Sequence, residues 1–234
     1  MHQPTPDRPV SIGTRNERSL HSSLKDWYAR PGDLLEEKVD GTIVDILRED
    51  LIIEIQTSNF GVMKRKLSKL LEYNKVLLVY PVAREKLIIR IDPETGKVLK
   101  TRKSPKTGSI YDLFSELVYI PHLVKNRNLS IEVAFIREES VWCDDGEGSW
   151  KRKGTSVKDH RLAEVVETRR FNDCNSYLGL LPPSLPQQFT NRELAEALRI
   201  RMRLTAKMTY CLKKMGVIRE TGRKGRSILL EKST

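Results

Sequence analysis

Two short runs of β-branched and apolar residues, separated by a charged pair, stand out in the first quarter of the chain. They span 43–47 and 51–55, and Glu49-Asp50 lies between them. This pattern predicts a β-hairpin. If the chain reverses at the charged pair, residues whose numbers add to the same total face each other, so Asp45 lies opposite Glu54. Because like charges that face each other destabilise a sheet, this pair indicates that a cation or a proton lies between them.

Helical patterns flank the hairpin. A capping box over 14–17 predicts the start of a helix, and Glu17 lies on its apolar stripe. The stripe continues through Leu20, Leu24, Trp27 and Tyr28. Apolar spacing over 63–71 predicts a second helix, and the almost wholly apolar run 75–81 predicts a strand that is buried on both faces. The predicted order is therefore helix, hairpin, helix, strand, which is an α/β core.

This order of elements, with an acid in the first helix, Asp45 on one strand and Glu54-x-Gln56 on the next, resembles the PD-(D/E)XK superfamily of restriction-endonuclease-like nucleases. The third position of that motif is usually lysine, whereas this chain has Gln56. The glutamine variant is most similar to competence-protein and transposon-end nucleases. The resemblance covers 14–82 and implies a mixed-sheet fold with metal-dependent nuclease activity.

The resemblance also implies a Mg²⁺ site, with Mn²⁺ as a substitute, built from Asp45, Glu54 and the carbonyl of Ile55. Glu17 would reach in from the first helix as a further catalytic acid. Mg²⁺ prefers oxygen ligands and keeps several waters. In phosphodiester hydrolysis the metal acidifies the attacking water and stabilises the departing oxygen.

Gln56 would orient the attacking water as a catalytic residue, but a neutral amide supplies no positive charge. Lys64 and Lys66, at the start of the second predicted helix, are candidates for the missing ammonium. We prefer Lys66 as the catalytic residue.

Each of these residues also has a structural interpretation. The capping box alone explains Glu17, and Lys64 and Lys66 border a helix where charged residues usually face water. The facing of Asp45 and Glu54 depends on the register, because a slip of one residue would send one acid to the opposite face.

The end of the chain carries a second pattern. A capping box precedes a predicted helix over 191–198, and a second helix is predicted over 203–215, ending at Gly216. Two short strands over 217–230 follow, around a glycine-rich basic tip. This succession resembles a winged helix-turn-helix, a module that binds DNA or, in other proteins, a protein partner.

Charge favours nucleic acid, with DNA ahead of RNA, as the partner. The chain has a net charge of +11, and residues 188–234 alone contain twelve Lys and Arg against four Glu. Three predicted contacts lie on or beside the recognition helix and three more lie in the wing: Arg201, Arg203, Lys207, Arg223, Lys224 and Arg226.

The middle of the chain is predicted to extend or support the nuclease-like sheet, without an independent domain. Its pattern predicts, in order, a hairpin, a basic loop, a helix, a strand, a hairpin tip and a helix. These elements span 86–98, 102–108, 110–124, 129–136, 142–150 and 159–169.

We therefore expect a disordered tail over 1–12, a nuclease-like domain over 13–181, a linker over 182–187 and a winged helix over 188–234. Nothing in the sequence resembles a signal peptide or a membrane span. The three cysteines show no paired spacing, so the sequence indicates neither a disulfide framework nor a zinc site and favours the cytoplasm.

Three functions remain open at this stage. The first is a Mg²⁺-dependent DNA endonuclease of a restriction, recombination, mobile-element or phage-defence process. The second is a non-catalytic DNA-binding regulator or scaffold with a vestigial nuclease fold, which Gln56 favours. The third is an enzyme that acts on RNA or needs a partner protein. Because one active site cuts one strand at a time, cutting of both strands suggests a homodimer.

Overall fold

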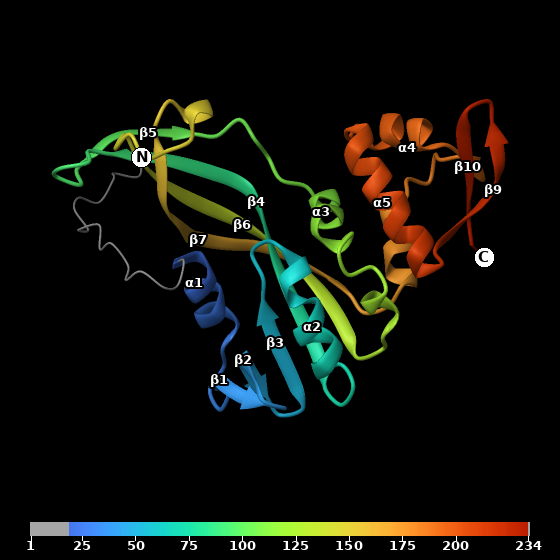
Figure 1. Cartoon of the computed structure of the whole chain (residues 1–234), viewed down its shortest axis with the longest axis horizontal. Coiled ribbons are helices and arrows are strands. Elements are labelled where there is room, and N and C mark those ends of the chain that lie inside the picture. Colours follow the sequence, from blue (N-terminus) through green and yellow to red (C-terminus); the bar gives the residue numbers. More distant parts are fainter. Residues whose placement is uncertain (1–18, 234) are drawn as a thin grey trace, which may run out of the picture.

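A mixed seven-stranded sheet forms the centre of the molecule, for which a computed structural model describes residues 19–233 (Figure 1). The strand order is β1-β2-β3-β4-β6-β7, and β5 pairs with β4. The strands β3, β4 and β6 are mutually parallel neighbours, and the other pairs are antiparallel. The strands are β1 Leu34–Val39, β2 Thr42–Arg48, β3 Leu51–Ile55, β4 Lys75–Ile91, β5 Val98–Lys103, β6 Leu129–Cys143 and β7 Ser156–Phe171. This arrangement confirms the predicted α/β class with a mixed sheet.

Two helices cover opposite faces of this sheet. On one face, α1 (Ser19–Tyr28) buries Leu24 against Ile53 and its neighbours. On the other, α2 (Phe60–Leu70) buries Leu67 in the cluster that contains Ile52. Alternate residues of β3 thus point to different helices, as the period of a strand requires.

The predicted hairpin is present in the predicted register. Ile46 pairs with Ile53 and Arg48 pairs with Leu51, so the chain reverses at Glu49-Asp50. Glu49 has a φ of 50°, which is the left-handed conformation that a tight hairpin turn needs. The helix over 63–71 and the strand from Lys75 are confirmed as well.

Three features of this core differ from the prediction. Strand β1 was not predicted, and it joins β2 through a turn at Asp40-Gly41, where both residues have positive φ. Strand β4 continues to Ile91, far beyond the predicted end. Trp27 is 51 % exposed, whereas Leu20, Leu24 and Tyr28 are buried as predicted.

The prediction of a helix over 159–169 is wrong, because this segment is part of the edge strand β7. The ladder between β6 and β7 shifts register between Arg137 and Glu138, which leaves Ala163 as an extra residue. Leu162 and Val165 therefore face the same side although they are three residues apart. A β-bulge thus produces the spacing of a helix face.

The segment over 110–124 forms three short helical pieces in place of one helix: η1 Ile110–Asp112, α3 Leu113–Leu117 and η2 Leu123–Lys125. Phe114 and Leu117 are buried as predicted. The predicted hairpin over 86–98 corresponds to β4 and β5. The predicted hairpin tip over 142–150 lies between β6 and β7 and leads into η3 (Trp150–Arg152).

The C-terminal unit contains the two predicted helices and the two predicted strands. They are α4 Asn191–Leu198, α5 Met202–Met215, β9 Ile218–Lys224 and β10 Ser227–Lys232, with a short strand β8 (Gln188–Phe189) beside β10. Thr190 and Glu193 form the predicted capping box, and Gly216 ends α5 with a φ of 81°.

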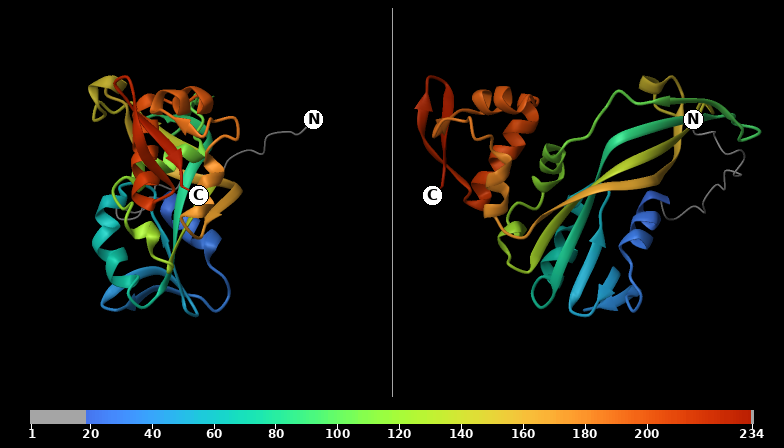
Figure 2. Two further views of the ribbon diagram at one scale, coloured as in Figure 1. Left: turned by 90° about the vertical axis from the view of Figure 1, so that its right-hand side faces the viewer. Right: turned by 180° about the vertical axis from the view of Figure 1, so that it is seen from behind.

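This unit packs against the first domain, and it lies at the opposite end of the molecule from β5 (Figures 1 and 2). Buried side chains of α5 and of α3 belong to one continuous core. Leu181 and Leu185, which border and occupy the predicted linker, are each 6 % exposed and belong to this core. The last turn of η4 (Asn175–Leu180) leads directly into this packed segment.

Within residues 19–233, no helix has the length and apolar character needed to cross a membrane. The predicted tail over 1–12 and the capping box over 14–17 lie outside the described residues.

Candidate metal centre and nucleic-acid interface

The two predicted acids lie where the β2–β3 ladder ends. The last pair of the ladder is Ile46 with Ile53, and Asp45 and Glu54 are the next residues of that register. The side chain of Glu54 is almost fully buried, and Lys66 of α2 donates a hydrogen bond of 2.7 Å to its Oε2. The preference for Lys66 over Lys64 agrees with this contact, since Lys64 is exposed.

The second oxygen of this carboxyl group, Glu54 Oε1, is buried without a hydrogen-bond partner among the described residues. A buried carboxylate oxygen that lacks a partner costs free energy, on the order of 1–3 kcal/mol or more for a charged group. The fold therefore keeps an acceptor in a place where an electropositive ligand would stabilise it.

Burial raises the pKa of Glu54 to about 7, and the nearby charge of Asp45 adds to this shift against the opposing effect of Lys66. Burial also disfavours the charged form of Asp45. Hydrogen bonds from His21 and from the amide of Ile55 outweigh that effect, so the pKa of Asp45 lies below its usual value. At neutral pH Asp45 is therefore ionised, whereas Glu54 is close to its pKa and is only partly ionised.

Asp45 is held by groups from two other elements. The amide of Ile55 donates a hydrogen bond of 2.8 Å to Asp45 Oδ2, and His21 Nε2 of α1 lies 3.3 Å from the same oxygen. Helix α1 thus contributes to the site on one side, while α2 contributes Lys66 on the other. Sequence reasoning missed His21, because a single histidine on a helix face gave no ligand spacing.

A strained residue lies beside the acids. Glu36 of β1 has a φ of 53°, and the β1–β2 ladder omits it together with Asp45. Its carboxylate accepts a hydrogen bond of 2.6 Å from Lys25, a lysine whose side chain is only 7 % exposed. Backbone strain of this kind costs on the order of 1–3 kcal/mol and is concentrated at functional sites. The flanking pairs, Leu35 with Ile46 and Glu37 with Val44, place Glu36 opposite Asp45 at this gap in the ladder.

The remaining predicted residues have different outcomes. The side-chain amide of Gln56 donates to the carbonyl of Ser58, so it is turned toward its own loop. The main-chain amide of Gln56 donates to the carbonyl of Val79 and continues the β3–β4 ladder. Glu17 lies outside the described residues.

The acids fit a hard cation such as Mg²⁺. Asp45 and Glu54 follow the last pair of one ladder in the same register, and Glu54 Oε1 has no hydrogen-bond partner among the described residues. The part of the chain that the structure describes holds no group of three or more His, Cys, Asp and Glu placed to bind a metal. A Mg²⁺ ion held by the two carboxylates would keep several waters in its coordination shell.

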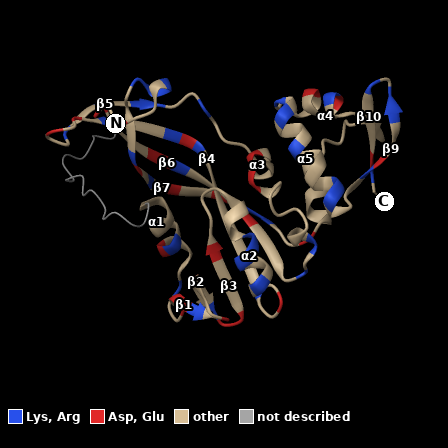
Figure 3. Ribbon diagram, viewed as in Figure 1, with Lys and Arg blue, Asp and Glu red and all other residues tan. Residues whose placement is uncertain are grey.

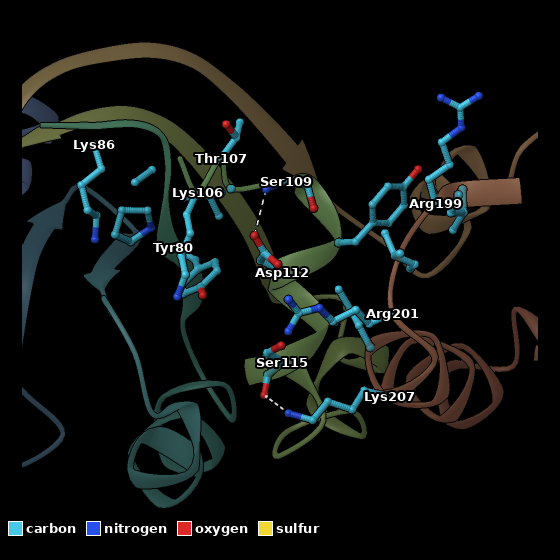
Figure 4. Close-up of a pocket in the computed structure, with 18 of the residues that line it drawn as sticks. Tyr80, Lys86, Lys106, Thr107, Ser109, Asp112, Ser115, Arg199, Arg201 and Lys207 are labelled. Carbon is cyan, nitrogen blue, oxygen red and sulfur yellow. Dashed lines mark hydrogen bonds between the residues drawn. The ribbon is translucent and has the colours of Figure 1, made fainter. Parts of the chain in front are cut away.

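The six predicted DNA contacts divide into two sets. Arg201, Arg203 and Lys207 face a groove of about 1010 Å³ between the C-terminal unit and the first domain (Figure 4). Lys207 also donates a hydrogen bond of 3.2 Å to the carbonyl of Ser115, in α3.

The wing set is exposed at the tip between β9 and β10. Arg223 and Arg226 are exposed, and Lys224 forms an ion pair of 2.9 Å with Glu193 of α4. Figure 3 marks the Lys and Arg positions of this unit in blue along the ribbon.

The geometry defines a mixed-sheet α/β protein with a buried acid–lysine site and a basic C-terminal unit. The family model described as "Domain of unknown function (DUF8091)" matches residues 18–172, and the chain belongs to this family. Its match covers the sheet, α1, α2 and α3, and it ends before the C-terminal unit.

An uncharacterized protein of Treponema pallidum (strain Nichols) is 35% identical to this chain over 188 residues, which cover 80% of this chain and 74% of the relative. No solved structure matches.

Proposed function

We propose that this protein is a metal-dependent nuclease that hydrolyses phosphodiester bonds in DNA. The observation that carries the proposal is the buried carboxyl group of Glu54. Lys66 donates to one of its oxygens, the other has no partner among residues 19–233, and Asp45 lies beside it. Burying a carboxyl group beside a second acid costs free energy, so a hairpin with a purely structural role does not favour such a pair. The proposal extends the resemblance to PD-(D/E)XK nucleases.

In this proposal Asp45, Glu54 and the carbonyl of Ile55 hold Mg²⁺ or Mn²⁺. The bound cation would acidify the attacking water and stabilise the departing oxygen. The hydrogen bond from Ile55 and the contact with His21 orient Asp45. Lys66, held at 2.7 Å from Glu54, supplies the positive charge that the motif lacks at Gln56 and offsets charge on the phosphate.

The C-terminal unit, in this proposal, is a winged helix that holds the DNA. Two helices in sequence followed by a basic antiparallel hairpin support it, as does the concentration of Lys and Arg in residues 188–234. The wing residues Arg223, Lys224 and Arg226 would contact phosphates.

A DNA-binding scaffold without chemistry is the second candidate. The orientation of the Gln56 amide toward Ser58 favours it, because this amide is engaged with the backbone.

Cleavage of supercoiled plasmid and of labelled single-stranded DNA separates the two candidates. The wild type is compared with Asp45→Ala and Glu54→Ala in Mg²⁺, Mn²⁺ or EDTA. Loss of either acid should reduce metal-dependent cutting by at least about 10³-fold and leave DNA binding within a few-fold, since the lost interaction acts on the transition state.

Asp50→Ala is the matched control, because Asp50 is an exposed acid at the turn of the same hairpin and pairs only with Lys75 on the surface. It should cut like the wild type. Binding without any cutting by the wild type would favour the scaffold.

A further inference from the structure

The groove between the two domains has walls from distant parts of the chain. Arg199, Arg201 and Arg203 line it from the C-terminal unit, while Lys106 lines it from the loop after β5 (Figure 4). All four are exposed, and none takes part in an ion pair within residues 19–233. The groove therefore carries a net positive charge, since six Lys and Arg line it against two acids.

The two acids of the groove are already engaged. Asp112 accepts a hydrogen bond of 2.8 Å from the amide of Ser109, which forms a capping box. Glu138 lies 2.8 Å from Lys86 and also contacts His160. Asp112 keeps its negative charge, because an amide hydrogen bond does not neutralise a carboxylate. The six Lys and Arg of the lining still outnumber these two acids, so an external anion would be attracted.

The start of α5 adds a second, independent feature. Arg201 is the N-cap residue of this long helix, and no side chain caps it. Residues 201–204 of this first turn line the groove, apart from Met202. Helix N-termini bind phosphate groups through their unpaired amides and their dipole.

The floor of the groove lies on β4, the strand that pairs with the one that carries Glu54. Tyr80 to Ala83 of β4 form this floor, and they directly follow Val79, whose carbonyl accepts from Gln56. Val79 is also the ladder partner of Ile55, next to Glu54. A chain of phosphates that lies along the groove would thus lead to the hairpin acids.

The shape of the groove suits a single strand better than a duplex. Helix α5 packs against α3, and Lys207 is tied to Ser115, so α5 is not free to enter a major groove that must accommodate a whole helix. Tyr80 and Tyr111 line the groove, and Tyr80 is braced edge-on by Phe60 with ring centroids 5.3 Å apart. A basic groove with aromatic side chains is the usual platform for single strands.

We infer that this groove binds a single-stranded segment of DNA, with Arg199, Arg201, Arg203 and Lys106 on its phosphates and Tyr80 and Tyr111 against its bases. The inference rests on the proposed function only in that the strand leads to a cutting site at Glu54. In this inference the wing binds double-stranded DNA, and the groove binds the single strand that reaches Asp45 and Glu54.

Binding of a labelled oligothymidine and of a duplex of equal length tests this, with the full chain in EDTA. The groove variant Arg199→Gln/Arg201→Gln/Arg203→Gln is compared with the wing variant Arg223→Gln/Lys224→Gln/Arg226→Gln. Both remove the same number of charges from exposed positions, so the fall in net charge is matched. Thermal melting checks that both fold.

The groove variant should lose roughly tenfold or more in affinity for the single strand. Its salt dependence should become shallower by about 2, because each lost phosphate contact lowers the slope by about 0.7. The wing variant should lose more affinity for the duplex than for the single strand. Equal single-strand affinity in the groove variant and the wild type would overturn the inference.

Cutting in Mg²⁺ by the same proteins separates this inference from the proposed function. If the wild type cuts and the groove variant binds and cuts a single strand equally well, the groove inference fails and the nuclease stands. If nothing is cut but the groove variant still loses single-strand binding, the nuclease fails and the groove stands.

Discussion

The charged side chains of the acid site are buried or half-buried and paired, whereas the arginines of the C-terminal unit that face the groove are exposed. Glu54, Asp45 and Lys66 lie close together at the end of a ladder, with the carboxyl of Glu54 buried and tied to one lysine. In contrast, Arg201 and Arg203 are exposed and make no ion pair within the described residues.

This difference matters because burial decides how much one residue contributes. In the acid site, low solvent exposure strengthens each interaction and shifts the pKa of Glu54 to about 7. On the surface, water and salt screen each charge, so only a group of cations has a large effect. Single substitutions should therefore act strongly at the hairpin, whereas several are needed at the groove.

Substitution of Lys66 should show the largest of the remaining effects. Lys66→Ala removes the positive charge at 2.7 Å from Glu54, and we expect cutting to fall by about 100-fold. The pKa of Glu54 should also rise, because Lys66 opposes the effect of burial. Initial rates of plasmid nicking across a pH series measure both changes.

Lys64→Ala is the control for that experiment, since Lys64 is exposed on the same helix. It should retain the wild-type rate and pH profile. A Lys66→Ala protein that cuts like the wild type would show that the hairpin acids do not need this ammonium.

Glu54→Gln should stabilise the metal-free protein at alkaline pH. In the folded state the pKa of Glu54 is about 7, above the usual value of 4.5. The unfolded chain therefore releases this proton first, and the wild type loses stability as the pH rises from about 4.5 to about 7. The variant does not titrate, and above pH 7 we expect an advantage of roughly 1–3 kcal/mol that vanishes near pH 4. Urea unfolding in EDTA at several pH values measures it.

Addition of Mg²⁺ sharpens the same comparison. A cation bound to the folded state stabilises it by mass action, so Mg²⁺ should raise the melting temperature of the wild type and leave that of Glu54→Gln unchanged. Asp50→Asn, at the exposed turn, should respond to pH and to Mg²⁺ like the wild type. Equal Mg²⁺ responses in all three proteins would contradict a site at Glu54.

Substitution of Gly108 should have the smallest effect, and only binding in the groove should change. A Cβ at Gly108 would lie 2.6 Å from Val82 Cγ1 and 2.7 Å from the carbonyl oxygen of Ala83, so the loop that carries Lys106 must move. Gly108→Ala should weaken single-strand binding a few-fold and leave duplex binding unchanged. Gly179→Ala is the control, because a Cβ there would lie no closer than 3.5 Å to a neighbouring atom, Arg169 Nη2, and Gly179 does not line the groove. Fluorescence anisotropy with both ligands checks this.

Local patterns in the sequence were sufficient for the hairpin. The turn at Glu49-Asp50 and the register that puts Asp45 and Glu54 directly after the pair of Ile46 and Ile53 follow from the alternation of side chains along two adjacent strands, which depends on neighbours in the chain. The helices over 191–198 and 203–215 were predictable for the same reason, since caps and apolar spacing are local signals.

The failures lie where distant segments meet. The strand β7 was predicted as a helix, because its bulge at Ala163 exists only in the ladder with β6. Strand β1 was not predicted, and the contact of His21 with Asp45 arises only when α1 lies against the sheet. Such contacts have no signature in the spacing of residues along one segment.

The sequence by itself determined the acid pair, the α/β class and the basic C-terminal unit, because each follows from side-chain chemistry and local periodicity. Only the tertiary structure decided that Lys66 reaches Glu54 and that Arg201 and Arg203 turn toward the first domain. The physical reason is that burial and the packing of α5 against α3 depend on residues far apart in the chain.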